Sequence, residues 1–597
     1  MSTQVYEDAL DLDLELLEST PLAVDGPFAS SYPFPFLSKT GNRQTVTTRT
    51  VVIENDVLTC TLAPDLGGRI VHLLDKRTGA VIVTPPNHKG LLEAGPRGVE
   101  AREGIRWRAI TERHNDLGPV DFQLVEPNGE GDPCGVWLHE LVSGSPVSVH
   151  LGLFLAPGSA EIHFEMKTFN RALSSAPISP QFLFPADLSR LVRSGRIDAW
   201  YDDRRDVGLG VLFGPAQVRG VSALDADSVR VCRFPGGAGR LGPRQLDTWT
   251  GALLPLSGLG GLDAIGERCA LAHDDAGIRI SYSRPPGSAK LVLQSETGAT
   301  VEARLESHMG VPLRIGKPEM ESKIRGFAVL NDQKEELVRW EAGVEYDDVR
   351  ASEPVREDYP FETAFFQAVQ DLGEVDENGL LSAAQELGLK AAALSAFGLI
   401  ALRQERFEDA AALFDDSLLY NAEDHLTWWC KALSLRHAGD ESPESQELVN
   451  AHYLAPLEPA LRAEGFFRQP DAVDGSALIK RLAQDADALV EVACHLYEWR
   501  LYSDLARWVQ AALQHRDVPM LRYLLAEAMF QSGKMPSEAA NEVRLASGKP
   551  INPPYPWRPA ERAVLESLGK RFPGDRRIAE LLALITWGTT SFTRSTT

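Results

Sequence analysis

The stretch from Glu100 to Asp121 carries side chains that could perform acid–base chemistry on a sugar. Its acids are Glu100, Glu103, Glu112, Asp116 and Asp121, and its bases and aromatic ring are Arg106, Arg108, Arg113, His114 and Trp107. A saccharide site needs carboxylates that bridge hydroxyl pairs, a cationic donor that positions oxygens and an aromatic plate for the apolar ring face. This stretch offers all three, although the same charge density is also typical of a solvated loop.

Two reactions fit these side chains. Mutarotation of an aldose needs a carboxylate that takes the anomeric proton and a His-like acid that protonates the ring oxygen. Glycoside hydrolysis needs two carboxyl groups, one of them protonated, at a separation of roughly 5–9.5 Å. The candidate proton carriers are His114, Asp121 and Glu296, with Asp116 and Glu302 as further carboxyl candidates. The candidate substrate-binding residues are Arg69, Glu103, Arg106, Trp107 and Asp116.

The run from Ala63 to Arg69 predicts a strand, a turn at two glycines and a second strand. Gly67 and Gly68 permit a positive φ or a close backbone approach. Arg69 then stands at the start of the next strand, a rigid position from which a guanidinium could bind hydroxyls or a carboxylate. The competing interpretation is a β-bulge in which Arg69 pairs with a structural acid.

Strands must hold these residues in place. From about Thr45 to about Arg339, apolar and polar residues alternate between segments rich in Gly and Pro. The runs 147–155 and 160–166 both alternate, and the turn residues 156–159 between them predict an antiparallel hairpin. Many short strands with few helical stretches indicate a sandwich or a barrel.

The second half of the chain changes to a helical period. From about Tyr359 onward Ala and Leu dominate, and Leu394, Phe397, Gly398 and Ala401 fall on one helical face. The pattern resembles the tetratricopeptide repeat, with Phe414 at the position of a large apolar residue that fills the gap between paired helices. We expect four degenerate helical pairs that stack into a solenoid, because one repeat cannot bury its own apolar face.

Several segments resemble, in order, a family of largely uncharacterised bacterial proteins. The family joins an N-terminal galactose-mutarotase-like β-supersandwich to C-terminal tetratricopeptide repeats. The resemblance rests on the run 63–79 and on weaker matches at 103–107, 119–122, 169–171, 293–295 and 554–566. It implies a saccharide ligand, since such folds occur in sugar epimerases, lyases and accessory domains of glycoside hydrolases, although a fold alone does not establish a function.

The predicted fold is therefore a multidomain chain in which an antiparallel β-supersandwich precedes a helical solenoid. The expected boundaries are an N-terminal extension at 1–44, the β-domain at 45–344, a linker at 345–360, the solenoid at 361–585 and a disordered tail at 586–597.

The chain departs from the family pattern at Arg106, where relatives usually carry an acid, and at Arg108, where they usually carry Asn. If the replaced acid is catalytic in relatives, this chain has lost that chemistry or moved it. An alternative is that the two arginines create a site for an anionic sugar such as a uronate, because Arg binds carboxylates with two hydrogen bonds.

Composition excludes several other classes of protein. The chain has 597 residues and a formal net charge of −24, which gives no overall electrostatic help in binding nucleic acid or an anionic membrane. The acidic N-terminus has no signal-peptide pattern, and the six cysteines form no C-x-x-C pair, so we expect a cytoplasmic protein with buried thiols. Phosphate-loop, zinc-helix and nucleophile-elbow motifs are missing, so we expect no cofactor and assign no metal ligands. Metal dependence stays open, because acids this numerous could host a divalent ion without a motif.

Two hypotheses follow. The first is a carbohydrate-active enzyme, glycoside hydrolase-like or less favourably an aldose epimerase, that takes a monosaccharide or an oligosaccharide in a cleft of the β-domain. The second is a protein that binds sugar without turnover, or a scaffold, in which the solenoid docks a protein partner or a second copy.

Overall fold

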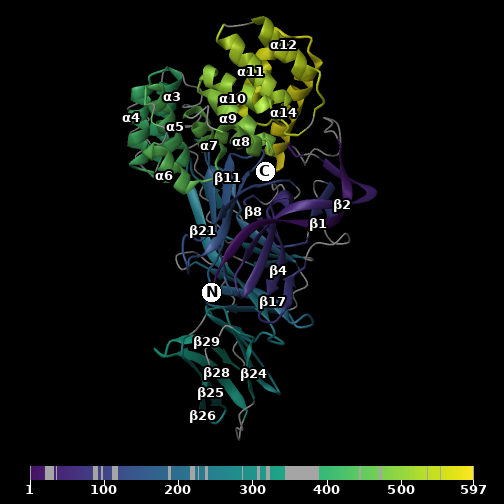
Figure 1. Cartoon of the computed structure of the whole chain (residues 1–597), viewed down its shortest axis with the longest axis vertical. Coiled ribbons are helices and arrows are strands. Elements are labelled where there is room, and N and C mark those ends of the chain that lie inside the picture. The colour runs from purple at the N-terminus through teal and green to yellow at the C-terminus, as the bar shows by residue number, and fades with distance from the viewer. Residues whose placement is uncertain are drawn as a thin grey trace.

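The structure of the chain is a computed structural model with three parts stacked along one long axis (Figure 1). A helical solenoid lies at one end, a large β-domain in the middle and a smaller β-domain at the other end. The described residues are 2–20, 33–34, 36–84, 92–95, 98–101, 103–110, 118–185, 190–214, 222–225, 228–234, 239–284, 287–305, 310–316, 323–342, 389–440, 442, 445–468, 473–533, 536–551 and 553–595.

The large β-domain is built from antiparallel sheets. One has the strand order β1-β2-β3-β4-β5, with bounds β1 Gln4–Thr20, β2 Phe36–Glu54, β3 Leu58–Ala63, β4 Arg69–Asp75 and β5 Ala80–Val83, and the short 3-10 helix Pro64–Leu66 follows β3. The largest has the order β15-β16-β17-β21-β12-β11-β10-β9, with bounds β9 Asp121–Val125, β10 Cys134–Leu141, β11 Val147–Leu155, β12 Ile162–Asn170, β15 Arg190–Ser194, β16 Ile197–Asp202, β17 Val207–Phe213 and β21 Leu246–Ser257.

Smaller sheets complete this domain. A four-stranded sheet has the order β18-β19-β14-β8, with bounds β8 Arg106–Arg108, β14 Gln181–Pro185, β18 Ser222–Asp225 and β19 Ser228–Cys232. Two further pairs are β6 Leu92–Gly95 with β7 Gly98–Ala101, and β13 Ala176–Ile178 with β20 Gly239–Leu241.

The predicted hairpin is the centre of the eight-stranded sheet. β11 pairs with β12 in the register Val147↔Asn170 to Leu155↔Ile162, which confirms the hairpin and its turn. Val149, Leu151 and Leu153 enter the main core, because side chains alternate between the two faces of a strand. The residues between them, including His150, therefore face the opposite side of the sheet.

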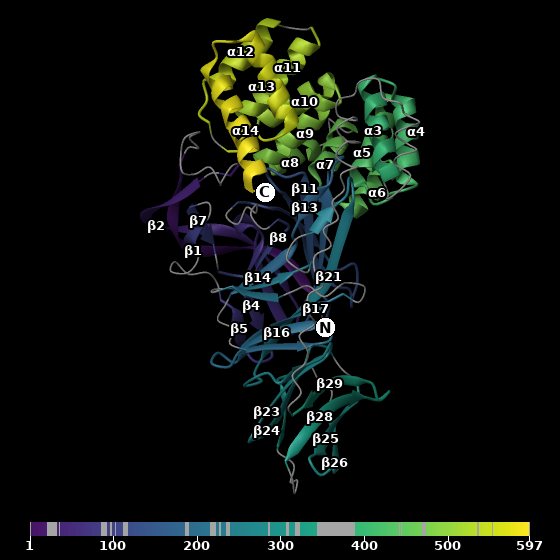
Figure 2. The ribbon, with the colours of Figure 1, turned by 180° about the vertical axis from the view of Figure 1, so that it is seen from behind.

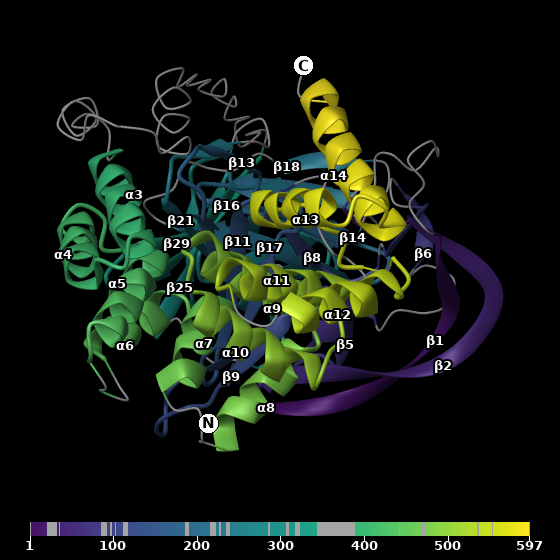
Figure 3. The same ribbon diagram turned by 90° about the horizontal axis from the view of Figure 1, so that it is seen from above.

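The first strand belongs to this domain. β1 pairs with β2 along nearly its whole length, so most of the segment expected to precede the β-domain is part of its first sheet. Leu12 on β1 packs against Ala63, Leu66 and Val71, which holds the hairpin on the domain. Viewed from above, the two strands curve around one side of the molecule (Figure 3).

The smaller β-domain has its own core. Its two sheets have the orders β22-β23-β24-β27 and β26-β25-β28-β29, with bounds β22 Ala264–Ile265, β23 Cys269–Asp274, β24 Gly277–Tyr282, β25 Ala289–Ser295, β26 Thr300–Leu305, β27 Leu313–Gly316, β28 Ile324–Asn331 and β29 Glu336–Glu341. Ile280 from one sheet packs with Leu291 and Phe327 from the other. The region expected to form one β-domain thus contains two cores, and Figure 2 shows the smaller part below the larger from the opposite side.

The solenoid contains six helical pairs among the described residues, where the repeat pattern predicted four. The bounds are α3 Leu389–Arg403, α4 Phe407–Leu418, α5 His425–His437, α6 Gln446–Leu454, α7 Pro459–Arg468, α8 Val473–Leu482, α9 Ala486–Glu498, α10 Tyr502–Leu513, α11 Pro519–Gln531, α12 Pro536–Ser547, α13 Pro559–Arg571 and α14 Arg576–Ser595. Phe414 packs directly against Gly398, as the repeat pattern predicts.

The ends of the solenoid differ from the sequence-based boundaries. The expected linker at 345–360 lies outside the described residues. α14 extends to Ser595, through most of the segment expected to be a disordered tail. No helix among the described residues combines the length and the apolar character that a membrane span requires.

The solenoid docks on the outer face of the eight-stranded sheet. Leu141 on β10 and Phe169 on β12 join the solenoid core rather than the β-domain core. The Phe169 ring lies 4.1 Å, centroid to centroid, from the ring of His425 at the start of α5. This ring contact is part of the interface between the two domains.

Candidate functional site

A cavity of about 290 Å³ lies between the large β-domain and the solenoid. Its β-domain wall is Pro33, Phe34, Leu37, Gly118, Pro119, His139, Glu140, Leu141 and Ser143. Its helical wall is Gln484, Asp485, Ala486, Asp487, Arg516, Pro553, Pro554, Tyr555 and Trp557. We call this cavity the interdomain pocket; neither domain alone forms it.

The two-glycine turn supports the β-domain wall of the interdomain pocket. Gly67 and Gly68 have φ values of 71° and 67°, in the left-handed region where glycine is favoured, as the sequence predicts. The Gly67 amide donates to the carbonyl oxygen of Gly118 (2.9 Å), and the Val120 amide donates to that of Pro64 (3.0 Å). The turn therefore positions the backbone next to Pro119.

The N-terminus of α9 supplies two carboxyl groups to the helical wall. Asp485 caps the helix and accepts a hydrogen bond from the Asp487 amide (2.9 Å). Asp487 accepts a hydrogen bond from the Ser143 hydroxyl of the β-domain (2.9 Å), and its other oxygen pairs with Arg558 (2.9 Å). Loss of hydration and the nearby Asp487 charge raise the pKa of Asp485 to about 7, so it holds its proton for a large part of the time at neutral pH.

The segment before α13 supplies the aromatic side chains. Tyr555 is buried and Trp557 is half-buried. The Arg558 guanidinium lies 4.4 Å from the Trp557 ring centroid, which fixes the indole by a cation–π contact. The amides of Trp557 and Arg558 both donate to Glu561 at 2.8 Å, and burial raises the pKa of Glu561 to about 7.

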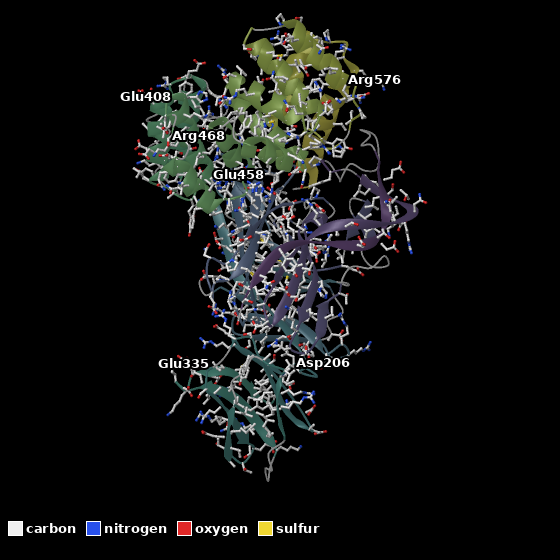
Figure 4. All side chains as sticks on the ribbon, in the orientation of Figure 1. Asp206, Glu335, Glu408, Glu458, Arg468 and Arg576 are labelled. Atoms are coloured by element: carbon white, nitrogen blue, oxygen red, sulfur yellow. The ribbon has the colours of Figure 1, made fainter. Side chains whose placement is uncertain are left out.

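Behind the pocket, histidines of the sheet face a buried glutamate of the solenoid, labelled in Figure 4. Glu458, directly before α7, is fully buried; its carboxylate lies 3.7 Å from His139 Nε2, 3.5 Å from His425 Nε2 and 3.4 Å from Arg171. Despite burial, the Arg171 charge and the two imidazoles hold the pKa of Glu458 well below its usual range. Burial lowers the pKa of the neighbouring His150, so this histidine is neutral at pH 7.

Arg171 ties the domains together. It follows β12 and pairs with Glu458 and, at 2.5 Å, with Glu491 of α9. Glu491 also pairs with Arg558, so a single chain of charges connects the sheet, α9 and the segment that carries Trp557. Among the described residues, no group of three or more His, Cys, Asp or Glu side chains is arranged to hold a metal ion.

Arg69 and Trp107 lie close together and are packed in the interior. Arg69 is 1% exposed, and its guanidinium donates to the carbonyl oxygens of Leu66 (2.8 Å) and Glu103 (2.9 Å). Trp107 is also 1% exposed, its indole donates to the Gly68 carbonyl (3.4 Å), and it belongs to the main core. The ring face of Trp107 is therefore covered by protein. Glu103 is half-buried, and its backbone carbonyl oxygen accepts the hydrogen bond from Arg69.

Asp121 lies under the solenoid. Its carboxylate pairs with Arg462 of α7 at 2.5 Å and with Arg481 of α8 at 3.0 Å. These two contacts make it a docking residue between the domains.

Arg106 and Arg108 lie on the face of β8 opposite the core. Trp107 pairs with Phe182 of β14, and both enter the main core. Arg106 is opposite Leu183, which is opposite Arg230 of β19, so these arginines share the other face of the sheet. Arg106 and Arg108 on β8 and Arg230 on β19 thus share one face of the sheet with β14 between them, and Arg106 is buried.

Glu296 lies far from these residues in the fold. It is exposed in the turn between β25 and β26 of the smaller β-domain, where its amide donates to the carbonyl oxygen of Lys323. Glu302, on β26, makes a surface pair with Lys290. Asp121 and Glu296 are thus not brought into one site, and His114 and Asp116 lie outside the described residues.

The residues that line the interdomain pocket were missed as site residues. The run 554–558 stood out in the sequence as a match between repeat blocks, yet nothing in it indicates contact with β10. Asp485 and Asp487 have the spacing of an ordinary helix start. Only the docking of the two domains brings these groups to His139 and Glu140.

No family model and no curated protein matches the chain. Among solved structures, a TPR-domain protein from Parabacteroides distasonis is 12% identical, with a TM-score of 0.37, and the match covers 96% of each chain. A galactose mutarotase-like protein from Clostridium acetobutylicum is 9% identical (TM-score 0.26, 35% of this chain and 96% of the other), and a putative aldose 1-epimerase from Klebsiella pneumoniae is 10% identical (TM-score 0.27, 42% and 92%). The arrangement of an antiparallel β-supersandwich before a helical solenoid is evident from the strand order and helices described above.

Proposed function

We propose that the protein is carbohydrate-active and binds one unit of a saccharide in the interdomain pocket. The observation that carries the proposal is the lining of this pocket, which combines carboxyl groups (Glu140, Asp485 and Asp487), an imidazole (His139) and aromatic rings (Tyr555 and Trp557). These are the group types that sugar recognition needs. The volume, about 290 Å³, is near the lower end of the range for small-molecule sites, which suits a single ring rather than a long chain.

The rigidity of the pocket supports binding. Asp487 is held by Ser143 and Arg558, and Trp557 is held by Arg558, so neither group needs to be ordered when a ligand arrives. Less entropy is lost on binding when the side chains are already fixed. The charge network around Arg171 extends this order to the relative position of the two domains.

Asp485 favours hydrolysis as a second candidate function. A carboxyl group with a pKa of about 7 is partly protonated at neutral pH and can deliver a proton to a glycosidic oxygen. Glu140 and Asp487 are the other carboxylates that line the same pocket. Asp121 and Glu296 are not part of this proposal, because they lie outside the pocket and in different domains.

The experiment that tests the function is a binding and turnover screen on the full chain. Neutral and acidic monosaccharides and short oligosaccharides are titrated by calorimetry, and nitrophenyl glycosides are assayed for release of nitrophenol. We expect Trp557→Ala to weaken binding at least tenfold and Asp485→Asn to abolish any turnover while leaving binding within about threefold.

Asp424→Asn is the control for Asp485→Asn, since Asp424 is also a helix-capping aspartate, bonded to the Thr427 amide at the start of α5, and does not line the pocket. Binding of a neutral sugar that survives Trp557→Ala unchanged contradicts the proposed pocket. A chain that binds no member of the panel contradicts sugar binding altogether and favours the scaffold hypothesis.

A further inference from the structure

A second cavity, of about 690 Å³, lies at the other end of the large β-domain, where it meets the smaller one. Its walls are the β4–β5 turn (Arg77, Thr78), the β16–β17 turn (Arg205, Asp206) and the segment 311–314 with Arg314. Figure 4 labels Asp206 at this junction. We call it the arginine cavity, because three arginines line it in a chain with a formal net charge of −24.

Two of these arginines keep their charge available. Arg77 is neutralised by Asp75, which accepts from its guanidinium at 2.9 and 2.8 Å. Among the described residues, the Arg205 guanidinium donates only to the Val81 carbonyl oxygen, at 3.2 Å. Within the described part of the chain Arg314 makes no ion pair, and both Arg205 and Arg314 are exposed.

The single acid on the wall is already used by the protein. Asp206 Oδ1 accepts hydrogen bonds from the Tyr201 hydroxyl (2.5 Å) and from the Gly260 amide. These bonds hold the turn in which Asp206 itself adopts a φ of 55°. The carboxylate is a structural group that keeps its negative charge, so three arginines set against Asp75 and Asp206 leave a net excess of one positive charge around the cavity.

The rest of the wall suits an organic ligand rather than a bare ion. Val311 is 58% exposed and stands beside Pro312 and Leu313. The Thr78 hydroxyl, 2.7 Å from that of Ser257, adds a polar group near Gly258. A cavity with cationic donors, a hydroxyl and a short apolar strip fits a small organic molecule.

We propose that the arginine cavity binds a small organic molecule through an oxyanion group, a carboxylate or a phosphate, held by Arg205 and Arg314. Charge-assisted hydrogen bonds from guanidinium to such an anion are the strong class of hydrogen bond, and the anion neutralises the local excess of positive charge. The site is separate from the interdomain pocket and does not depend on the function proposed for it.

The test is calorimetry on the full chain with four probes: glucose 6-phosphate, glucuronate, inorganic phosphate and glucose. We expect glucose 6-phosphate or glucuronate to bind, glucose to bind at least tenfold more weakly, and the affinity to fall as salt is raised. The stronger of the two anions identifies the oxyanion. Phosphate that binds as tightly as both organic anions contradicts the organic-ligand part of the proposal.

Arg205→Gln and Arg314→Gln should each weaken binding about tenfold, since one lost charge-assisted bond corresponds to about 1.4 kcal/mol. Arg304→Gln is the matched control, an exposed arginine on β26 that does not line the cavity. Anion binding that is unchanged in the Arg205→Gln/Arg314→Gln double variant overturns the proposal. Loss of binding in that variant while Trp557→Ala has no effect separates this site from the interdomain pocket.

Discussion

The two junctions of the large β-domain are built in opposite ways. At the solenoid junction, paired charges are buried beside the apolar contact of Leu141 and Phe169: Arg171, Glu458 and Glu491 are all less than a tenth exposed. At the junction with the smaller β-domain, Leu254 and Leu256 pack against Leu262 and other apolar residues. The arginines of this second junction stand at the edge of that apolar contact, around the arginine cavity.

The difference has a consequence for function. Paired buried charges demand one geometry, because a small displacement leaves a charge without a partner in a medium of low dielectric constant. Apolar contact tolerates small shifts and leaves the surrounding charges open to solvent and ligands. The solenoid junction therefore suits a pocket of fixed shape, and the other junction suits capture of an anion.

Among the variants proposed, we expect Arg171→Met to cause the largest loss of folding free energy. The change leaves Glu458 and Glu491 with one cation fewer in a buried setting, and we expect a loss of about 3–5 kcal/mol of folding free energy. Urea denaturation at pH 7 measures it. Arg325→Met, which removes the partner of an exposed pair with Glu341, is the control and should cost less than about 1 kcal/mol.

The Arg171→Met effect should depend on pH. Arg171 helps to hold the pKa values of Glu458 and Glu491 below their usual range in the folded state. That stabilisation is present above the unfolded pKa near 4.5 and is lost as pH falls through the folded values. The difference between wild type and variant should shrink below about pH 4. A difference that is constant with pH contradicts the role of these carboxylates.

Asp121→Ala gives the second largest effect. It leaves Arg462, which is mostly buried, without its closest carboxylate, and releases Arg481. We expect a loss of about 2 kcal/mol in folding free energy, with saccharide affinity unchanged within about threefold. Denaturation and calorimetry measure the two quantities. Loss of turnover with unchanged stability would instead support the catalytic role suggested by the sequence.

Arg284→Met tests the other junction. Arg284 pairs with Glu161, a buried carboxylate at the start of β12, but Arg284 is about half exposed and the Ser283 hydroxyl also donates to Glu161 (2.6 Å). We expect a loss of about 1 kcal/mol, smaller than for Arg171→Met, because water can replace the guanidinium. Thermal denaturation of the two variants side by side gives the comparison. Equal losses would remove the distinction between the junctions.

Asp485→Asn gives the smallest effect. The folded pKa of Asp485 is about 7 against an ordinary 3.8, so the folded state holds an extra proton between these values, and stability falls as pH rises through this window. Asn keeps the helix cap without the proton. Between pH 5 and pH 8 we expect the free energy of unfolding of the variant to rise by about 1 kcal/mol relative to that of wild type. The change is small because Asp485 is partly exposed, and solvent weakens the coupling between its pKa and stability. Denaturation at both pH values measures this gain, and no gain would contradict the raised pKa.

Local patterns predicted local structure well. The alternation at 147–166 and the turn between its halves specify the β11–β12 hairpin, because side-chain direction in a strand depends only on neighbouring residues. Gly67 and Gly68 adopt the predicted positive φ, and Gly398 receives Phe414 as the repeat spacing requires.

The site could not be predicted in the same way. Trp107 lies among charged residues in the sequence, which favoured an exposed ring that binds sugar. In the structure it pairs with Phe182 across strands β8 and β14, and both side chains are buried in the main core. Glu140 and Asp485 are far apart in the sequence and line the same pocket because the solenoid docks on β10. Such contacts depend on how two domains pack, and no periodicity in either domain contains that information.

The most direct test is a crystal structure of the full chain with the tightest-binding neutral saccharide of the screen, which the arginine cavity is not expected to bind tightly. We expect one sugar ring in the interdomain pocket, with an apolar face near Trp557 and hydroxyls near Asp485 and Glu140. A sugar bound elsewhere, with the interdomain pocket unchanged from the unliganded protein, would contradict it.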